Sequence, residues 1–143
     1  MKQFSLILLA ILATSTCGRG NLGDGSDRID DVYGNLVQRR LGDDGTVSVL
    51  YHKDRYLYQV TFADGRSVSE AYFNLKGTDL TEKEITGFLK ANAARATWTR
   101  DNTAKERRFR RSDGKAEATY GKVNGRPSLT VRALRGKNGQ RDQ

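Results

Sequence analysis

Three glycine-containing turns, each set between short segments of alternating apolar and polar residues, constrain the fold of this chain most strongly. The turns are Gly42-Asp43-Asp44-Gly45, Ala63-Asp64-Gly65 and Asp113-Gly114. Asp-Gly sequences between alternating segments are typical of β-hairpins, because glycine adopts the left-handed backbone that a tight turn needs. The sequence therefore predicts antiparallel hairpins.

The segments beside these turns predict the strands. In the first half of the chain, four strands over residues 36–41, 46–51, 56–62 and 66–73 form a meander. In the second half, two strands flank Asp113-Gly114, and a last strand covers residues 128–134 after the turn at residues 124–127.

A short helix is predicted before the first strands. Ser26 or Asp27 can cap it, and Ile29, Val32 and Tyr33 follow at helical spacing. Gly34 ends it after about two turns, as a glycine after a helix commonly does.

A second helix has the clearest start signal in the chain. Thr81 as N-cap and Glu84 three residues later form a capping box, and Leu80 and Ile85 are placed for a hydrophobic staple. The apolar stripe of Ile85, Phe88, Leu89 and Ala93 predicts a helix that ends near Arg95.

A helix followed by strands thus occurs twice. Each half contains two strands joined by an Asp-Gly turn, and the second of these strands ends near a tyrosine, Tyr72 or Tyr120. We interpret this as a weak internal duplication. The predicted fold class is α+β: an antiparallel β-sheet meander with both helices on one face, a two-layer sandwich.

Hairpin register predicts which side chains face the core. A two-residue loop at Asp113-Gly114 pairs Phe109 with Ala118, Arg107 with Tyr120, Arg111 with Ala116, and Arg110 with Glu117. Phe109 then points inward while Arg108 and Arg110 point outward. For the Asp64-Gly65 hairpin two registers stay open: Phe62 with Ser67 and Val60 with Ser69, or Val60 with Val68.

The first 17 residues predict an export signal. Lys2 precedes an apolar run over residues 4–13 and then small residues, and the run is too short to span a bilayer as a helix. Cleavage after Ala13-Thr14-Ser15 would release a soluble protein, whereas lipidation of Cys17 would anchor it to a membrane. Both outcomes stay open. The expected location is periplasmic, outer-membrane-anchored or extracellular.

The rest of the chain divides into three parts. Residues 18–26 are rich in glycine and small polar residues and predict a flexible tether, residues 27–135 predict a single α+β domain, and residues 136–143 predict a basic disordered tail. Cys17 is the only cysteine, so the domain can form no internal disulfide.

Positive charge is concentrated near the C-terminus. Residues 105–143 carry 12 Lys/Arg and 4 Asp/Glu, whereas residues 21–104 carry 11 and 13. This asymmetry favours contact with an anionic partner such as lipid headgroups, lipopolysaccharide, acidic wall polymers or an acidic protein face, although a basic surface can also serve solubility alone. Nucleic acid is a less suitable partner after export. The candidate contact residues are Arg108, Arg110, Lys122, Arg132 and Arg135.

No pattern predicts a catalytic residue, a cofactor or a metal site. His52, the only histidine, has no nucleophile motif around it, and the acids Asp24, Asp27, Asp30 and Asp31 lack the ligand spacing of a calcium loop. We expect a non-enzymatic protein. A secreted hydrolase whose paired carboxylates meet only in the fold is the alternative.

Two segments carry a family resemblance. Ile29-Asp30-Asp31-Val32-Tyr33-Gly34 and Tyr58-Gln59-Val60-Thr61-Phe62-Ala63-Asp64-Gly65 resemble small exported bacterial proteins with the β-lactamase-inhibitor-protein-like fold, including the small outer-membrane lipoprotein A type. Many of those proteins have a proline soon after the glycine, where this chain has Asn35-Leu36. The chain is also similar to uncharacterised exported proteins with the same hairpin pattern. The resemblance implies a scaffold for protein contacts in the cell envelope.

The processing of the N-terminus can be measured directly. We expect mass spectrometry of the mature protein from its native host to find either a lipid-modified Cys17 or a start after the small residues before it. A free terminus at Thr16 or Gly18 would rule out lipidation, and an intact Met1 would contradict the export signal itself.

Overall fold

The computed structural model describes residues 22–135, which form one eight-stranded antiparallel sheet and two helices. The predicted α+β class and its antiparallel sheet are confirmed. The predicted export signal, Cys17 and the C-terminal tail lie outside the described residues. In chain order the elements are α1 (Ser26–Tyr33), β1 (Asn35–Leu41), β2 (Val47–Lys53), β3 (Tyr56–Ala63), β4 (Arg66–Asn74), α2 (Glu82–Ala91), β5 (Trp98–Asp101), β6 (Arg107–Arg111), β7 (Ala116–Val123) and β8 (Arg126–Ala133).

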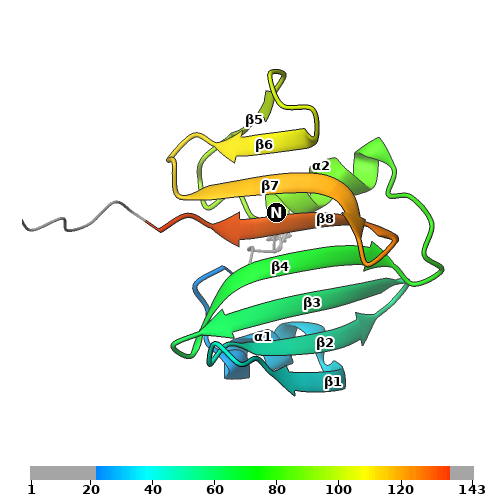
Figure 1. The fold of residues 1–143 in the computed structure, drawn as a ribbon, viewed down its shortest axis with the longest axis vertical. Helices are drawn as coiled ribbons and strands as arrows, with labels where there is room; N and C mark the ends of the chain where they lie inside the picture. The colour runs from blue at the N-terminus through cyan, green and yellow to red at the C-terminus, as the bar shows by residue number, and fades with distance from the viewer. Residues whose placement is uncertain (1–21, 136–143) are drawn as a thin grey trace, which may run out of the picture.

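The sheet is built from two meanders rather than from the single one that the sequence predicted. Its strand order is β1-β2-β3-β4-β8-β7-β6-β5, so that the last strand of each meander lies in the centre (Figure 1). Five residue pairs join β4 to β8, from Ser69 opposite Arg132 to Phe73 opposite Ser128. Short turns specify the contacts inside each meander, whereas this central pairing joins segments about half a chain apart.

The main core lies on the side of the sheet where the helices are seen in Figure 1. A row of cross-strand neighbours, Tyr51, Tyr58, Tyr72 and Leu129, runs across β2, β3, β4 and β8. Tyr33 of α1 stacks on Tyr58 with the ring centroids 4.2 Å apart, and Phe88 of α2 stacks on Tyr72 at 4.3 Å. Both helices are therefore held to the same row of rings.

A buried carboxylate crosses this core. Glu70 of β4 is 0% exposed, and its Oε2 accepts hydrogen bonds from the hydroxyls of Tyr72, at 2.5 Å, and Tyr33, at 3.1 Å. Asn92, directly after α2, donates from Nδ2 to the Tyr72 hydroxyl at 2.6 Å. Because an unsatisfied buried carboxylate would be costly, the two tyrosine donors from α1 and β4 are needed, and the end of α2 joins the network by donating to one of them.

Both helices differ from prediction at one end. Gly25, rather than Ser26 or Asp27, is the N-cap of α1, and no side chain caps it. Helix α2 ends at Ala91 rather than near Arg95. Asn92 is the C-cap of α2 and donates from Nδ2 to the Phe88 carbonyl as well as to Tyr72, and Ala94 and Arg95 then take positive φ values that a helix does not allow.

Two strands also depart from the prediction. Strand β5 was not predicted, because its four residues show no apolar alternation and Trp98 alone supplies a large apolar side chain. Strand β8 starts at Arg126 instead of residue 128, since the preceding turn is tight: Asn124 and Gly125 both have positive φ.

The hairpin registers are resolved. Phe109 pairs with Ala118, Arg107 with Tyr120 and Arg110 with Glu117, as predicted. In the β3–β4 hairpin Phe62 pairs with Ser67, but a bulge that leaves Val68 without a partner then places Glu70, and neither Ser69 nor Val68, opposite Val60. This one extra residue moves Glu70 to the core side of the sheet.

Residues 23–25 attach to the start of β4, whereas the sequence predicted a flexible tether as far as residue 26. The Gly23 amide donates to the Ser67 carbonyl at 2.8 Å, the Ser67 amide donates to the Asp24 carbonyl at 2.8 Å, and Gly25 forms a bridge with Arg66. The domain therefore begins before residue 27.

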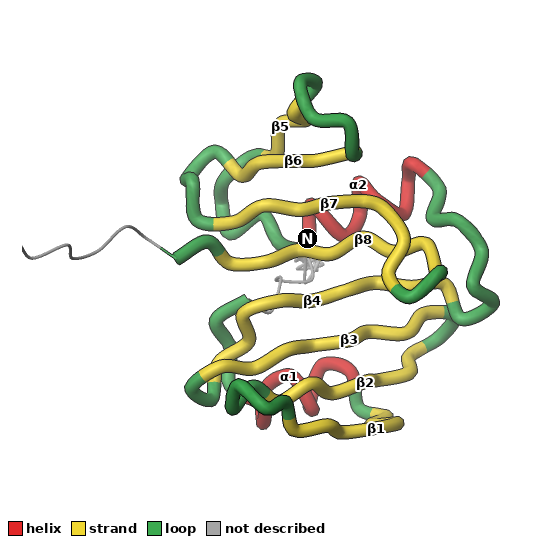
Figure 2. Tube along the Cα trace, viewed as in Figure 1, coloured by secondary structure: helices red, strands yellow, loops and turns green. Residues whose placement is uncertain are grey.

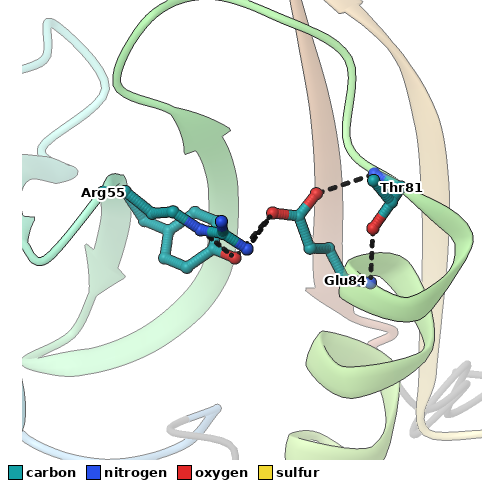
Figure 3. Close-up of polar contacts among 4 residues, drawn as sticks. Arg55, Thr81 and Glu84 are labelled. Carbon is teal, nitrogen blue, oxygen red and sulfur yellow. Dashed lines mark hydrogen bonds and ion pairs between the residues drawn. The ribbon is translucent and has the colours of Figure 1, made fainter.

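The predicted capping box starts α2 and also connects it to the sheet. The Thr81 amide donates to Glu84 Oε2 at 2.7 Å, and the Glu84 amide donates to Thr81 Oγ1 at 3.2 Å. The other carboxylate oxygen of Glu84 accepts from the Tyr56 hydroxyl at 2.7 Å and from Arg55 at 2.8 Å (Figure 3). These donors, led by the Thr81 amide, lower the pKa of the Glu84 carboxyl, whose side chain is 9% exposed.

We expect Thr81→Ala to lower the free energy of unfolding by about 1 kcal/mol, because the first turn of α2 loses its side-chain cap. Urea denaturation measures this, and Thr86→Ala, the same change at an exposed position within α2, is the matched control.

Since the folded-state pKa of Glu84 is depressed, its contribution is present at neutral pH and is lost as the pH falls below about 4.5, its ordinary value. Equal effects of Thr81→Ala and Thr86→Ala would contradict the capping assignment.

Candidate functional site: clefts on the open face of the sheet

The sheet face opposite the tyrosine row carries two continuous rows of mostly polar side chains. We call it the open face, because Figure 1 shows both helices on the other side. From β1 to β5, one row is Gln38, Leu50, Gln59, Ala71, Thr130, Thr119, Arg108 and Asp101, and the next is Arg40, Ser48, Thr61, Ser69, Arg132, Glu117, Arg110 and Thr99. Neither row contains an aromatic residue, and four arginines face two carboxylates.

A cleft of about 320 Å³ lies over β6, β7 and β8 on this face; we call it the arginine cleft. Three of the five predicted contact residues line it: Arg108, Lys122 and Arg132. The other lining residues are Glu106, Glu117, Thr119, Gly121, Val123, Ser128 and Thr130. Residues that alternate along three neighbouring strands thus converge because strand register places them in adjacent positions.

The two remaining predicted contact residues lie elsewhere. Arg110 is exposed on the open face, beside the arginine cleft but not among its lining residues, and Arg135 is exposed two residues after β8. The fold therefore brings together three of the predicted cations and leaves Arg135 apart from them.

One ion pair partly neutralises the arginine cleft. Arg132 donates from Nε to Glu117 Oε1 at 3.0 Å and also from Nη2 to the same oxygen. Glu117 is 8% exposed, whereas 62% of the Arg132 side chain is exposed. Glu106, the second carboxylate of the cleft, is exposed at the start of β6. Arg108 and Lys122 are thus the cations left for an anionic ligand.

Two buried polar atoms of the arginine cleft have no hydrogen-bond partner. They are Ser128 Oγ, in a residue 1% exposed, and Arg108 Nε. A buried hydroxyl without a partner costs about 1–3 kcal/mol, so such groups are usually paired by protein, water or ligand. Both atoms are shielded from solvent, so a ligand in the cleft meets the outer atoms of Arg108 and the side chains around Ser128 rather than these two atoms.

The acidic edge of this region stays charged at neutral pH. Asp101 accepts hydrogen bonds from the Thr103 hydroxyl at 2.6 Å and from the Thr103 amide at 3.0 Å, and these bonds lower the pKa of its carboxyl. Arg110 and Arg108 add to the lowering. Since Asp101 pairs with Arg108 across β5 and β6, it limits the positive potential on the β5 side.

A second cleft of about 310 Å³ lies on the same face over β1, β2 and β3, and we call it the glutamine cleft. Gln38, Arg40, Ser48, Leu50, Gln59 and Asn124 line it. Asn124 belongs to the β7–β8 turn, which extends toward β4 and β3 in Figure 2. Because Lys122 and Val123 of the same hairpin line the arginine cleft, the end of this hairpin borders both clefts.

A third cleft, of about 230 Å³, lies beside α1 and has a different chemistry. Its lining includes Asp27, Asp30, Leu36, Arg39 and Tyr51. The Tyr51 hydroxyl donates to Asp30 at 2.5 Å, and burial, followed by this hydrogen bond, raises the pKa of Tyr51 well above its usual range. None of the predicted contact residues lies here.

The acids considered as metal ligands lie in and just before α1, and the histidine lies in a strand. His52 lies in β2, with Nε2 2.9 Å from the Asp54 carbonyl oxygen. Asp24 pairs with Arg28 at 3.2 Å. Across residues 22–135, no three His, Cys, Asp or Glu side chains gather as metal ligands, and neither helix has the length and hydropathy to cross a membrane.

Sequence reasoning found the cations of the arginine cleft and missed its neutral members. Thr119, Thr130 and Ser128 alternate along β7 and β8 on the outward side, so the period-2 pattern could have placed them beside Arg108. The glutamine cleft was missed altogether, because Gln38 and Asn124 are far apart in the chain and meet only through the β4–β8 pairing.

Comparison with known proteins gives fold likeness alone. No family model matches the sequence, and no curated protein matches it either. A cysteine-rich secretory protein from Staphylococcus aureus aligns over 78% of this chain at 9% identity, with a TM-score of 0.45, and this chain spans 44% of its length. A DUF4309 family protein from Bacillus subtilis aligns over 78% of this chain and 79% of its own at 17% identity, with a TM-score of 0.43. TM-scores this low carry no functional conclusion.

We expect Arg132→Ala to lower the free energy of unfolding by about 1 kcal/mol, because Glu117 then keeps a nearly buried carboxylate without its guanidinium partner. The loss should shrink as salt is added, because the exposed Arg132 makes the pair accessible to screening. Urea denaturation at two salt concentrations measures it, with Arg126→Ala, an exposed arginine of the same strand, as the control. Identical stability of the two variants would show that the ion pair contributes nothing.

Proposed function

We propose that this is an exported, non-enzymatic protein of the periplasm or cell envelope that acts through surface contacts of its open face, and that the partner it contacts there is anionic. The observation that carries the proposal is the convergence of Arg108, Lys122 and Arg132 in one cleft on a sheet face that the helices do not cover. Cations on a concave surface raise the local concentration of an anionic partner and speed its association.

The N-terminal segment supports the export part of this proposal. Its charged start, apolar run and small residues match a secretory signal, and Cys17 offers the one route to a lipid anchor. Contact with a membrane would then go through that anchor. An envelope protein or an anionic envelope polymer is the expected partner, and nucleic acid is not.

We also propose that the fold is a two-layer sandwich that arose by internal duplication, related to the β-lactamase-inhibitor-protein-like proteins. Each half consists of one helix followed by a four-stranded meander, and the last strands of the halves, β4 and β8, pair with each other. In each half, a side chain of the helix reaches the row of core tyrosines: Tyr33 contacts Tyr58, and Phe88 contacts Tyr72. A duplicated scaffold with one free sheet face suits a protein that binds partners.

A secreted hydrolase is the second candidate function, and one observation favours it. Glu106 and Glu117 both line the arginine cleft, and paired carboxylates are the usual catalytic groups of glycoside hydrolysis. Against it, Arg132 donates two hydrogen bonds to Glu117 Oε1, so this carboxylate is already paired within the cleft.

We expect the double variant Arg108→Ala/Arg110→Ala to elute from an anionic matrix at a clearly lower salt concentration than the wild type, because both guanidiniums lie on the open face. Lys83→Ala/Lys90→Ala, which removes the same charge from exposed positions on α2, should elute close to the wild type. Equal shifts for the two double variants would reduce the effect to net charge and overturn the proposed site.

In the same assay Glu117→Gln should elute later than the wild type, since it removes a negative charge from the arginine cleft and leaves Arg132 available to the ligand. The hydrolase alternative makes a different prediction for this residue: Glu117→Gln would abolish the hydrolysis of an anionic polysaccharide.

A further inference from the structure

The open face has a composition that restricts its ligand. Of the sixteen residues in its two rows, only Leu50 and Ala71 are apolar, and the others carry hydroxyl, amide, guanidinium or carboxylate groups. The row beside them on the same face contains two more apolar side chains, Leu57, which is half-buried, and Phe73, which is buried. Such a surface can form many hydrogen bonds and offers little apolar area to bury.

This composition disfavours three other classes of anionic partner: an acidic protein, a single-stranded nucleic acid and a lipid surface. The cores of protein interfaces are enriched in aromatic residues and methionine, and proteins that bind single-stranded nucleic acid stack bases on aromatic rings, whereas these rows contain neither aromatic residues nor methionine. Binding to a lipid surface needs apolar side chains that enter the bilayer, and Leu50, the larger of the two apolar residues here, lies inside the glutamine cleft.

The two clefts suit a long ligand. They lie on one face and share a row, in which Gln38, Leu50 and Gln59 belong to the glutamine cleft and Thr130, Thr119 and Arg108 belong to the arginine cleft. Adjacent strands are about 4.8 Å apart, so the four steps from β2 to β7 place the cleft centres about 19 Å apart along the sheet. Between them lie the small side chains of Ser69 and Ala71 of β4 and the end of the β7–β8 hairpin, which borders both clefts. A linear polymer can reach both clefts, whereas a small anion occupies one.

The two clefts also differ in the chemical groups that they offer, and each suits a different part of one polymer. The arginine cleft offers guanidinium and ammonium groups together with the half-buried hydroxyls of Thr119 and Thr130, which suit a carboxylate surrounded by hydroxyls. The glutamine cleft offers the amides of Gln38, Gln59 and Asn124 with one arginine, which suit hydroxyl groups.

We infer that the open face binds a linear acidic polysaccharide, with a carboxylate-bearing sugar unit in the arginine cleft and hydroxyl groups of a unit further along the same chain in the glutamine cleft. This inference rests on the proposed function and specifies its partner. The carboxylate pairs with Arg108 and Lys122, and the hydroxyls of that unit bond Thr119 and Thr130.

The test compares polygalacturonate, which has carboxylates and hydroxyls, with polyglutamate of equal charge, which has carboxylates and backbone amides but no hydroxyls, and with a teichoic-acid-type polymer, which has phosphates and hydroxyls. Titration calorimetry at physiological ionic strength should show polygalacturonate binding at least about fivefold more tightly than polyglutamate, the equivalent of one retained hydrogen bond. The phosphate polymer tests which anionic group the arginine cleft prefers, because a guanidinium fork pairs with a carboxylate or with a phosphate.

Variants then separate the two clefts. Arg108→Ala should weaken both carboxylate polymers, whereas Gln59→Ala should weaken polygalacturonate about fivefold and leave polyglutamate and the short digalacturonate unchanged. Lys83→Ala, outside the open face, is the charge control, and urea denaturation verifies that each variant is folded.

Each outcome separates the inference from the proposed function. Equal or tighter binding of polyglutamate would overturn the polysaccharide inference and leave the anionic contact surface in place, with an acidic protein as its partner. Tighter binding of the phosphate polymer would show that the anionic group of the ligand is a phosphate and not a carboxylate. Failure of all three polymers to bind would overturn both proposals, and loss of binding in Lys83→Ala would show that the open face is not the site.

Discussion

The pairing of β4 with β8 is the constraint on which the rest of the structure depends. It joins two meanders that could each form locally, and its register aligns Glu70 with Val131 on one face and Ala71 with Thr130 on the other. A slip of one residue would move Thr130 and Arg132 into the core and Val131 out of it, because side chains alternate between the faces of a strand. The tyrosine core and the open-face rows are therefore fixed by the same five pairs.

The two faces of the sheet differ in composition and in what covers them. On the helix side, stacked rings exclude water, and Tyr33 and Tyr72 satisfy the carboxylate of Glu70 while Asn92 bonds Tyr72 in turn. Such a network costs little when each group has a partner and much when one is lost. Within residues 22–135 both faces keep buried polar atoms without a hydrogen-bond partner: Ser128 Oγ and Arg108 Nε on the open face, and Asn92 Oδ1, Trp98 Nε1 and Arg107 Nε on the helix side. The open face differs in that its polar side chains line two clefts that the helices do not cover.

Local signals in the sequence were reliable where a few neighbouring residues decide the conformation. The capping box of Thr81 and Glu84 and the Asp113-Gly114 hairpin are present as predicted, since each depends on contacts within a few residues. The bulge at Val68 and the end of α2 at Asn92 were not predicted, because both depend on contacts between distant segments. The bulge turns Glu70 toward Tyr33 and Tyr72, and the helix end places Asn92 against Tyr72. Strand β5 was missed for a related reason: it is an edge strand, and its pairing with β6 defines it more than its composition does.

The sequence by itself determined the α+β class, the hairpins and the outward direction of Arg108 and Arg110, because turn chemistry and a period of two residues act locally. Only the tertiary structure decided that Arg108, Lys122 and Arg132 line one cleft with Ser128 while Arg135 lies apart, and that Asn124 meets Gln38 across the sheet. Those juxtapositions depend on the long-range pairing of β4 with β8 and on the path of the β7–β8 turn, which no spacing within a single strand specifies.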